Sequence, residues 1–428
     1  MERINDDIWF SENSGAVIEF TEHDPRKYPT STRTWKKEET DEKALWAKWY
    51  APDNNFPMLA LDVITRNNIL FGVNDKQAAF LSGQRIRLYK EVIEEGKKRL
   101  DIVKDAEVED WLEKNNTSEQ FHNRFMDDLW LGSNFVELVF NGEQKVDTFL
   151  HLDATTCRTG KKNKRTKRVD NHFVGANWEK AHYDPKARGE DRKKNNIRRI
   201  PAFDPTNPTK YPKCIIHTKR YMPGHPYYPL PYWWPTVEWF RLASKIPAWH
   251  SFGMDNGYNI RYHVQIPKSY LENFQPSERE TKKQAIRDDM DAFLSNPKNN
   301  GKAFYSTYSN NGQLPDGWKI DPIDTKLNDE AYTALFDQSN IAVASGLGID
   351  PTLANIMLEG KLGNASEKRI AYQIHMALNT PRPRQRQLRL LETIQTINGW
   401  DPELKFGFED IEITKLDANP TGEQNIIG

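Results

Sequence analysis

Few residues of this chain have the types and spacings that chemistry requires. The loop that holds phosphate in nucleotide hydrolases has the pattern GxxxxGK[ST], and the closest glycine cluster, GLGID at 346–350, has no lysine and runs into a proline. The ten histidines form no HExxH, HxH or Cys/His pattern, and no GxSxG motif is present. We therefore expect neither ATP hydrolysis nor a zinc or nucleophilic-serine site.

Neighbouring carboxylates occur at Asp127/Asp128 and at Asp288/Asp289, both in charged segments with a helical pattern. Solvation on a helix face explains such pairs, whereas a nuclease needs carboxylates that converge on a metal ion. We expect no catalytic residue, no bound metal and no cofactor. The alternative left open is a metal-dependent DNA-processing enzyme whose carboxylates converge from distant segments.

The segment 158–199 is strongly basic, with 15 Lys or Arg against 5 Asp or Glu. It is too polar for a core, and we expect it to form loops that project from a sheet. Three interpretations remain: contact with DNA phosphates, attraction to an acidic neighbouring subunit, or a plainly solvated loop. In a DNA-binding protein its densest part would provide the contacts: Lys161, Lys162, Lys164, Arg165, Lys167 and Arg168.

The stretch PYYPLPYWWP at 226–235 combines aromatic rings with prolines that forbid a helix or a central strand. The rings could stack on sugars or bases, which would suit a carbohydrate-binding surface protein. Proline-fixed aromatic residues more often pack a junction between domains. For that reason we favour the second interpretation, and the lack of a visible secretion signal also argues against a carbohydrate-binding surface protein.

Composition limits the class of protein. Of 428 residues only 37% are hydrophobic, and 60 basic against 61 acidic residues give no overall attraction to nucleic acid. Cys157 and Cys214, the two cysteines, lie outside any CxxC pattern, so we expect a reducing compartment without disulfides. No apolar stretch approaches the ~20 residues of a membrane span. The many aromatic side chains favour subunit interfaces.

The first part of the chain is predicted to be mainly helical. Residues 1–57 have no regular period and indicate either an irregular arm that lies on a neighbour or disorder. Apolar spacing predicts a helix at 58–73 and one or two charged helices at 85–114. Thr117 and Gln120 have the spacing of a capping box for the next helix.

Strand-like segments then follow. Two β-favouring runs at 134–153 flank Asn141-Gly142, which predicts a hairpin with a tight two-residue turn. A helix should begin at Thr236, and Pro247 should kink it or end it early.

The last third alternates between helices and short strands. Ser277 and Glu280 have the spacing of a capping box for a helix that runs to 294. A polar loop at 360–364 separates two helical segments, and the second must break near Pro381 and Pro383. A β-like tail closes the chain. The fold class is therefore α+β.

The order and texture of the elements from 131 to about 400 resemble those of phage portal proteins. Gly132, Asn134 and Glu137 stand where that family has a G-N-x-E strand leading into a hairpin. The strongest resemblance covers 328–394. Its pieces match the turn, tunnel loop and kinked helix of the family: Gly348, Ile349, Pro351 and Leu353 for the turn, 360–365 for the loop, and Pro381 and Pro383 for the kink.

The resemblance implies a portal fold with a wing, a helical stem, an α/β clip and a long kinked helix preceded by a tunnel loop. In chain order the implied parts are an N-terminal arm at 1–57, the wing at 58–235 with its basic insertion at 158–199, stem helix 1 at 236–257, the clip at 258–328, stem helix 2 at 329–345, the turn and tunnel loop at 346–366, the kinked wing or crown helix at 367–400, and a C-terminal tail at 401–428.

The function implied is not enzymatic. Portal subunits form a ring of about twelve copies around a DNA channel at one capsid vertex, where heterologous contacts close the ring. The implied partners are double-stranded DNA, the large terminase and the head–tail adaptor, with the major capsid protein or scaffold as a further neighbour. The expected place is the virion after assembly in the host cytoplasm, with no membrane, and the expected process is packaging and ejection of the viral genome.

The resemblance also selects residues for contact with DNA. By itself Lys361 would be an ordinary surface lysine, but a tunnel loop would present it to the channel. Asn364 and Ser366 would be its polar companions, and Arg241 and Lys245 on the first stem helix are weaker second choices.

Overall fold

The computed structural model describes residues 45–50, 54–67, 69–94, 97–176, 178, 197–256, 260–267, 302–308, 319–322, 329–356 and 365–410, with short pieces between 2 and 19 and between 275 and 285. The chain divides into two compact units. The larger comprises residues 28–241 and 339–428, and the smaller comprises residues 1–27 and 242–338.

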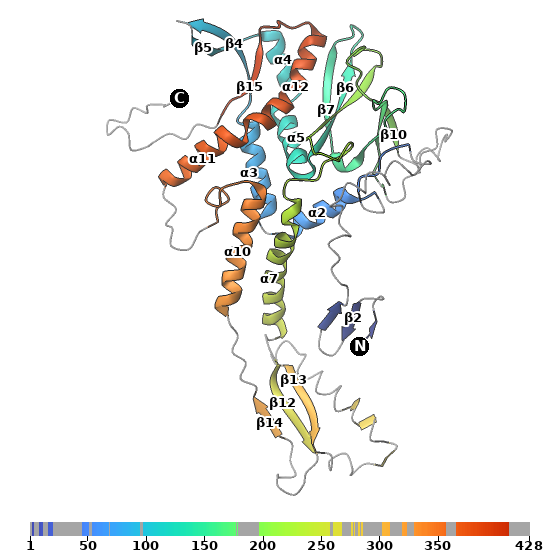
Figure 1. Cartoon of the computed structure of the whole chain (residues 1–428), viewed down its shortest axis with the longest axis vertical. Coiled ribbons are helices and arrows are strands. Elements are labelled where there is room, and N and C mark those ends of the chain that lie inside the picture. Colours follow the sequence, from blue (N-terminus) through green and yellow to red (C-terminus); the bar gives the residue numbers. More distant parts are fainter. Residues whose placement is uncertain are drawn as a thin grey trace. The chain divides into compact units, whose positions relative to one another are not determined.

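A three-stranded antiparallel sheet lies on one side of the helices of the larger unit (Figure 1). Its strands are β6 (Ser133–Phe140), β7 (Val146–Leu152) and β11 (Lys213–Lys219), with β6 in the middle. Val136 and Leu138 of β6 join the main hydrophobic core. From the same strand, Phe135 stacks on His217 of β11. Both faces of β6 are therefore covered, which is why this strand is an almost continuous apolar run.

The predicted hairpin is confirmed, but its turn was wrongly assigned. The connection is a longer loop at 141–145 in which Gln144, rather than Gly142, has a positive φ of 60°. The side-chain oxygen of Asn141 accepts the backbone N–H groups of Glu143 and Lys145 at 2.9 and 3.0 Å. Asn141 therefore organises the turn through its side chain.

The capping box predicted ahead of Phe121 is also wrong. Helix α5 (Thr117–Leu131) starts after Asn116, which gives no side-chain cap. The hydroxyl of Thr117 donates to the Leu112 carbonyl at 2.6 Å, and the Gln120 side chain accepts the His151 N–H at 2.6 Å. Both side chains join α5 to neighbouring segments.

The predicted charged helices at 85–114 are mostly a β-hairpin. Strands β4 (Ile86–Glu94) and β5 (Lys97–Val103) pair antiparallel, and only α4 (Ala106–Lys114) is helical. Strand β15 (Lys405–Phe408) from the predicted β-like tail pairs with the other edge of β4. The buried Leu88, Phe406 and Phe408 lie on the face of this sheet that joins the core.

The basic segment is not wholly a loop. Strands β8 (Cys157–Thr159), β9 (Asn171–Val174) and β10 (Arg198–Pro201) form an antiparallel sheet in the order β10-β9-β8. Arg158 is fully buried there, although it is the first residue of the basic segment. The part of the segment at 179–196 lies outside the described residues.

The end of the expected N-terminal arm packs on its own chain. Trp46 contacts the rings of Phe173 and Trp178, and Trp49 stacks on Tyr228 with ring centroids 4.2 Å apart. At least residues 45–50 therefore belong to the larger unit and are not a free arm.

Four further helices of the described residues belong to the larger unit. The helix predicted at 58–73 is two helices, α2 (Phe56–Arg66) and α3 (Leu70–Ser82), because the side chain of Asn67 accepts the N–H groups of Ile69 and Leu70 and starts a new helix. The predicted break at the proline pair is confirmed. It separates α11 (Ala365–Asn379) from α12 (Pro381–Asn398), and Figure 1 shows the two helices inclined to one another.

Two helices, α7 (Val237–Asn256) and α10 (Asp329–Leu347), have one end in each unit. Helix α7 continues through Pro247, so the prediction that it might end there was wrong. Gly346 near the end of α10 lies against Thr236, just before α7: a Cβ atom on Gly346 would be 2.7 Å from the Thr236 Cβ.

The smaller unit contains a mixed sheet. Strand β12 (Ile260–Pro267) pairs in parallel with β13 (Lys302–Tyr308) and antiparallel with β14 (Lys319–Pro322). Short strands also occur near the N-terminus: β1 (Glu2–Arg3), β2 (Ile8–Ser11) and β3 (Ala16–Glu19). Most of the helix predicted at 277–294 lies outside the described residues. With helices and mainly antiparallel sheets in one chain, the α+β class is confirmed. None of the described helices is both long and apolar enough to cross a membrane.

Candidate channel, basic-loop and subunit-contact surfaces

The segment that should carry the tunnel loop is fixed at its N-terminal side. Gly348 ends α10 with a positive φ of 68°, and Ile349 and Leu353 are buried in a small core with Val73 and Tyr372. Lys76 donates to the Leu353 carbonyl at 2.9 Å. The turn residues that resemble the portal motif therefore have a packing role.

The structure describes some of the predicted channel residues and not others. Lys361 and Asn364 lie outside the described residues. Ser366 is exposed in the first turn of α11. On α7, Arg241 forms an ion pair with Glu238 at 3.0 Å, and Lys245 is exposed in the other unit. The Glu238 carboxylate beside Arg241 offsets the positive charge of Arg241, so Lys245 presents the larger net positive charge of the two positions.

The loop between β8 and β9 carries most of the predicted basic patch. A backbone bridge joins Lys162 to Val169, and Asn163 accepts the Lys167 N–H through its carbonyl oxygen at 2.9 Å. Lys167 has a positive φ of 58° at the tip. We define the basic loop as its exposed cations together with the half-buried Lys161: Lys161, Lys162, Lys164, Arg165, Lys167 and Arg168. Arg168 is the one with a described ion pair, to Asp204 at 3.8 Å.

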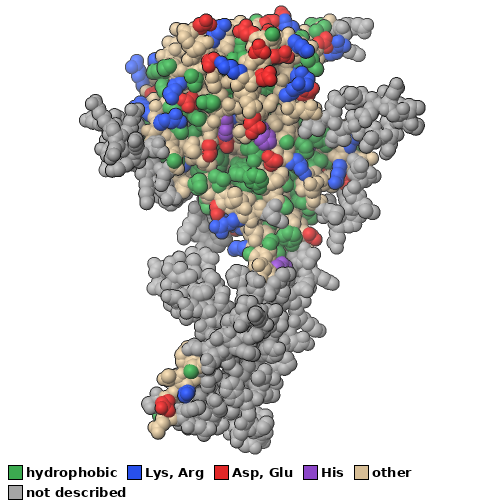
Figure 2. Space-filling view, turned by 180° about the vertical axis from the view of Figure 1, so that it is seen from behind, with side chains coloured by type: hydrophobic (Ala, Val, Ile, Leu, Met, Phe, Trp, Pro, Cys, Tyr) green, Lys and Arg blue, Asp and Glu red, His purple; other side chains and the backbone are tan. Residues whose placement is uncertain are grey.

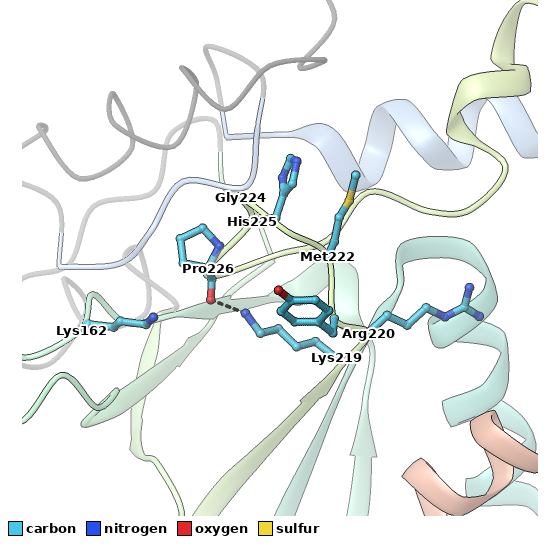
Figure 3. Close-up of a pocket in the computed structure, with 8 residues that line it drawn as sticks. Lys162, Lys219, Arg220, Met222, Gly224, His225 and Pro226 are labelled. Atoms are coloured by element: carbon cyan, nitrogen blue, oxygen red, sulfur yellow. Dashed lines mark hydrogen bonds between the residues drawn. The ribbon is translucent and has the colours of Figure 1, made fainter.

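A shallow pocket of about 470 Å³ opens beside the basic loop (Figure 3). Lys162 and Lys219 reach its wall, with Arg220, His225 and Pro226 around it. Burial, and next the charge of Lys162, lowers the pKa of Lys219 to about 8. Its ammonium donates to the carbonyls of Pro226 and Tyr227. These bonds use two of the three N–H donors of the ammonium.

A buried charge cluster that no sequence pattern indicates joins α12 to α5. Asp128 is fully buried, and one of its oxygens accepts from Arg220 at 3.1 Å and from Arg386 at 2.5 Å. Nearby, burial lowers the pKa of Arg124 to about 9, and its guanidinium contacts the Asn134 side chain. The local sequence pattern predicts a solvated helix face for Asp128. That prediction is wrong because its two partners, at positions 220 and 386, lie far away in the sequence.

The aromatic–proline stretch packs inside the larger unit. Tyr227, Tyr228, Trp233 and Trp234 are buried, and Phe56 contacts the Trp234 ring at 4.8 Å. These four rings are therefore packed within the larger unit rather than exposed for stacking on a sugar. Within the part of the chain that the structure describes, no three His, Cys, Asp or Glu residues lie together in a way that could hold a metal ion.

No family model matches the sequence, and no curated protein matches it. Solved structures do match its fold. One is a chain from the neck of an empty gene transfer agent particle computed with C6 symmetry, with a TM-score of 0.53, 15% identity and 87% of both chains covered. A second is from the virion of a native gene transfer agent particle, with a TM-score of 0.54, 13% identity and 91% of both chains covered. A third is from the native neck computed with C12 symmetry, with a TM-score of 0.53, 14% identity and 92% and 91% coverage.

The likeness extends over nearly the whole chain and shows the fold. These neighbours come from the neck or the virion of gene transfer agent particles.

Proposed function

We propose that this chain is a portal subunit that forms the ring through which a viral genome enters and leaves a capsid. The observation that carries the proposal is the fold likeness over at least 87% of both chains to components of particle necks, one of them computed with C12 symmetry. The broken α11–α12 helix after a fixed turn follows the order that the portal resemblance implies.

The parts of a portal are assigned by the same order. The wing corresponds to 58–235 together with the kinked helix at 367–400, which α11 and α12 form, the stem to α7 and α10, and the clip to 258–328 with its β12–β14 sheet. The clip is the proposed docking site for the large terminase and then for the head–tail adaptor. The basic loop faces the major capsid protein, the scaffold or packaged DNA.

The channel must hold DNA without gripping it. Each phosphate contact adds to affinity, so a dense basic lining would bind DNA too tightly for translocation. We assign the DNA contact to Lys361, with Asn364 and Ser366 as neighbours and with Lys245, then Arg241, on the stem. A chain of net charge −1 agrees with such a sparse lining. The portal itself hydrolyses no nucleotide.

The native mass of the purified chain tests the proposal. Light scattering or native mass spectrometry should give a closed ring of about twelve copies or a mixture of neighbouring sizes. Lys361→Ala should keep that mass and reduce packaged DNA, and Lys104→Ala, which changes an exposed lysine in another segment, is the control. A chain that stays monomeric or dimeric even with capsid proteins present would contradict the proposal.

The second candidate is a DNA-binding protein that uses the basic loop, favoured by five exposed cations on one turn. In that case a monomer would bind duplex DNA, and affinity would fall steeply with salt. The metal-dependent enzyme has no support from a metal-binding cluster within the described ranges.

A further inference from the structure

An apolar stripe runs along one side of α11. Ile370, Ile374 and Leu378 follow each other at four-residue intervals, so they lie on one face of the helix. Their exposed fractions are 51%, 54% and 75%. The opposite side of α11 is buried, since Tyr372 packs in the small core formed with α3 and the end of α10. We call these three residues the α11 stripe, and no described segment covers it.

A second apolar surface lies on the outer side of α3. Phe71 is 53% exposed, and its ring contacts Trp130 of α5. Gly72 beside it would place a Cβ atom in open space, which leaves room next to the Phe71 ring. Figure 2 shows that hydrophobic side chains are exposed on the rear face of the chain. We call Phe71, Gly72 and the edge of Trp130 the α3 surface.

The two surfaces point away from each other. Val73 and Phe80 of α3 pack on the core that contains Tyr372 of α11. At 100° per residue, Phe71 lies about half a turn from both Val73 and Phe80. The α11 stripe lies about as far around its own helix from Tyr372. One surface therefore faces one side of the α3–α11 layer and the other faces the opposite side.

A closed ring requires this arrangement. Each subunit of a cyclic ring uses two different surfaces, one for the subunit on either side. Resting on the proposed ring, we propose that the α11 stripe of one subunit packs on the α3 surface of the next, so that a second copy of this chain is the occupant of both surfaces.

Cysteine cross-linking tests the contact. Both native cysteines are buried, and burial raises their pKa values to about 12, so they stay unreactive toward maleimides. Phe71→Cys and Ile374→Cys are introduced together, and assembled rings are treated with a short bismaleimide. The double variant should give a denaturant-resistant ladder from dimers upward. A mixture of the two single variants should stop at dimers, and each single variant alone should stay monomeric on the gel.

A matched control pairs Phe71→Cys with Ile102→Cys, a side chain that is 59% exposed on the β4–β5 hairpin. Rings that form by native mass but give no more ladder than this control would overturn the contact and leave the ring intact. Failure to form rings at all would instead contradict the proposed function. As a second measurement, Ile374→Arg should raise the subunit concentration needed for assembly by about tenfold or more, because an apolar contact is replaced by a buried charge. An unchanged assembly concentration would also overturn the contact.

Discussion

At the scale of single residues, the most informative group is Asp128 with its two arginines. A fully buried carboxylate accepts from Arg220 and Arg386, so three segments far apart in the sequence depend on one side chain. A buried ion pair adds little over an apolar replacement, but removing one partner leaves a charge without compensation.

Asp128→Asn should therefore destabilise the larger unit by about 3 kcal/mol. The matched control is Asp62→Asn, which removes an exposed i,i+4 ion pair with Arg66 at 2.7 Å and should change stability very little. Chemical denaturation of both variants measures the difference. Equal stabilities would show that Asp128 does not hold the segments together.

Two buried histidines make stability depend on pH. Burial lowers the pKa of His172 to about 3, and the pKa of His217 is also well below its usual value, because of burial and then the charge of His172. The unfolded chain takes up these protons below about pH 6.5, whereas the folded chain excludes them. Stability from these groups is therefore present above that pH and is lost as the pH falls toward 3.

The free energy of unfolding should be about 2 kcal/mol smaller at pH 5 than at pH 7.5 for His172 alone. His172→Phe should reduce this slope, since the ring packs against Phe135 and its Nδ1 has no hydrogen-bond partner among the described residues. Urea titrations at the two pH values provide the test. A slope that the variant leaves unchanged would assign the effect to other groups.

At the scale of elements, sequence patterns predict some local pairings and miss others. The hairpin at β6–β7 and the helix break before Pro381 were predicted. The β4–β5 hairpin is equally local, but its apolar residues also fit the helical period, and the third strand of its sheet, β15, lies more than 300 residues away along the chain. A local pattern cannot register such a pairing.

The approach of Gly346 to Thr236 fixes where α10 meets the start of α7. Gly346→Ala should destabilise the protein by about 1–3 kcal/mol, because the added methyl group overlaps the Thr236 side chain. Gly142→Ala, in a loop where a Cβ meets open space, is the control and should be nearly neutral. Adding Thr236→Gly to Gly346→Ala should recover part of the loss. No recovery would place the strain elsewhere.

At the scale of the whole molecule, the sequence was sufficient to predict the class of fold but not the contacts between distant segments. The order of elements along the chain carries the portal resemblance. By contrast, the burial of Asp128 and Arg158 and the exposure of the α11 stripe depend on how distant segments pack together. The proposed DNA contacts Lys361 and Asn364 remain sequence-based proposals, since the described residues do not include them.

The nature of the subunit contact predicts how the ring responds to salt. Apolar packing between α11 and α3 should persist between about 50 mM and about 500 mM salt, whereas a contact made by the basic loop would be screened. The fraction of protein in rings, measured by light scattering across this range, should stay nearly constant. Dissociation at high salt would favour the acidic-neighbour interpretation of the basic loop.

The turn that starts at Gly348 also has a consequence for protein engineering. Ile349 and Leu353 fix the chain before 357, and Tyr372 fixes α11 after 364, all in the same small core. We therefore expect substitutions between 357 and 364 to leave the packing of both attachment points unchanged. Variants with different loop charges at this position would then share one scaffold, so their effects can be compared directly.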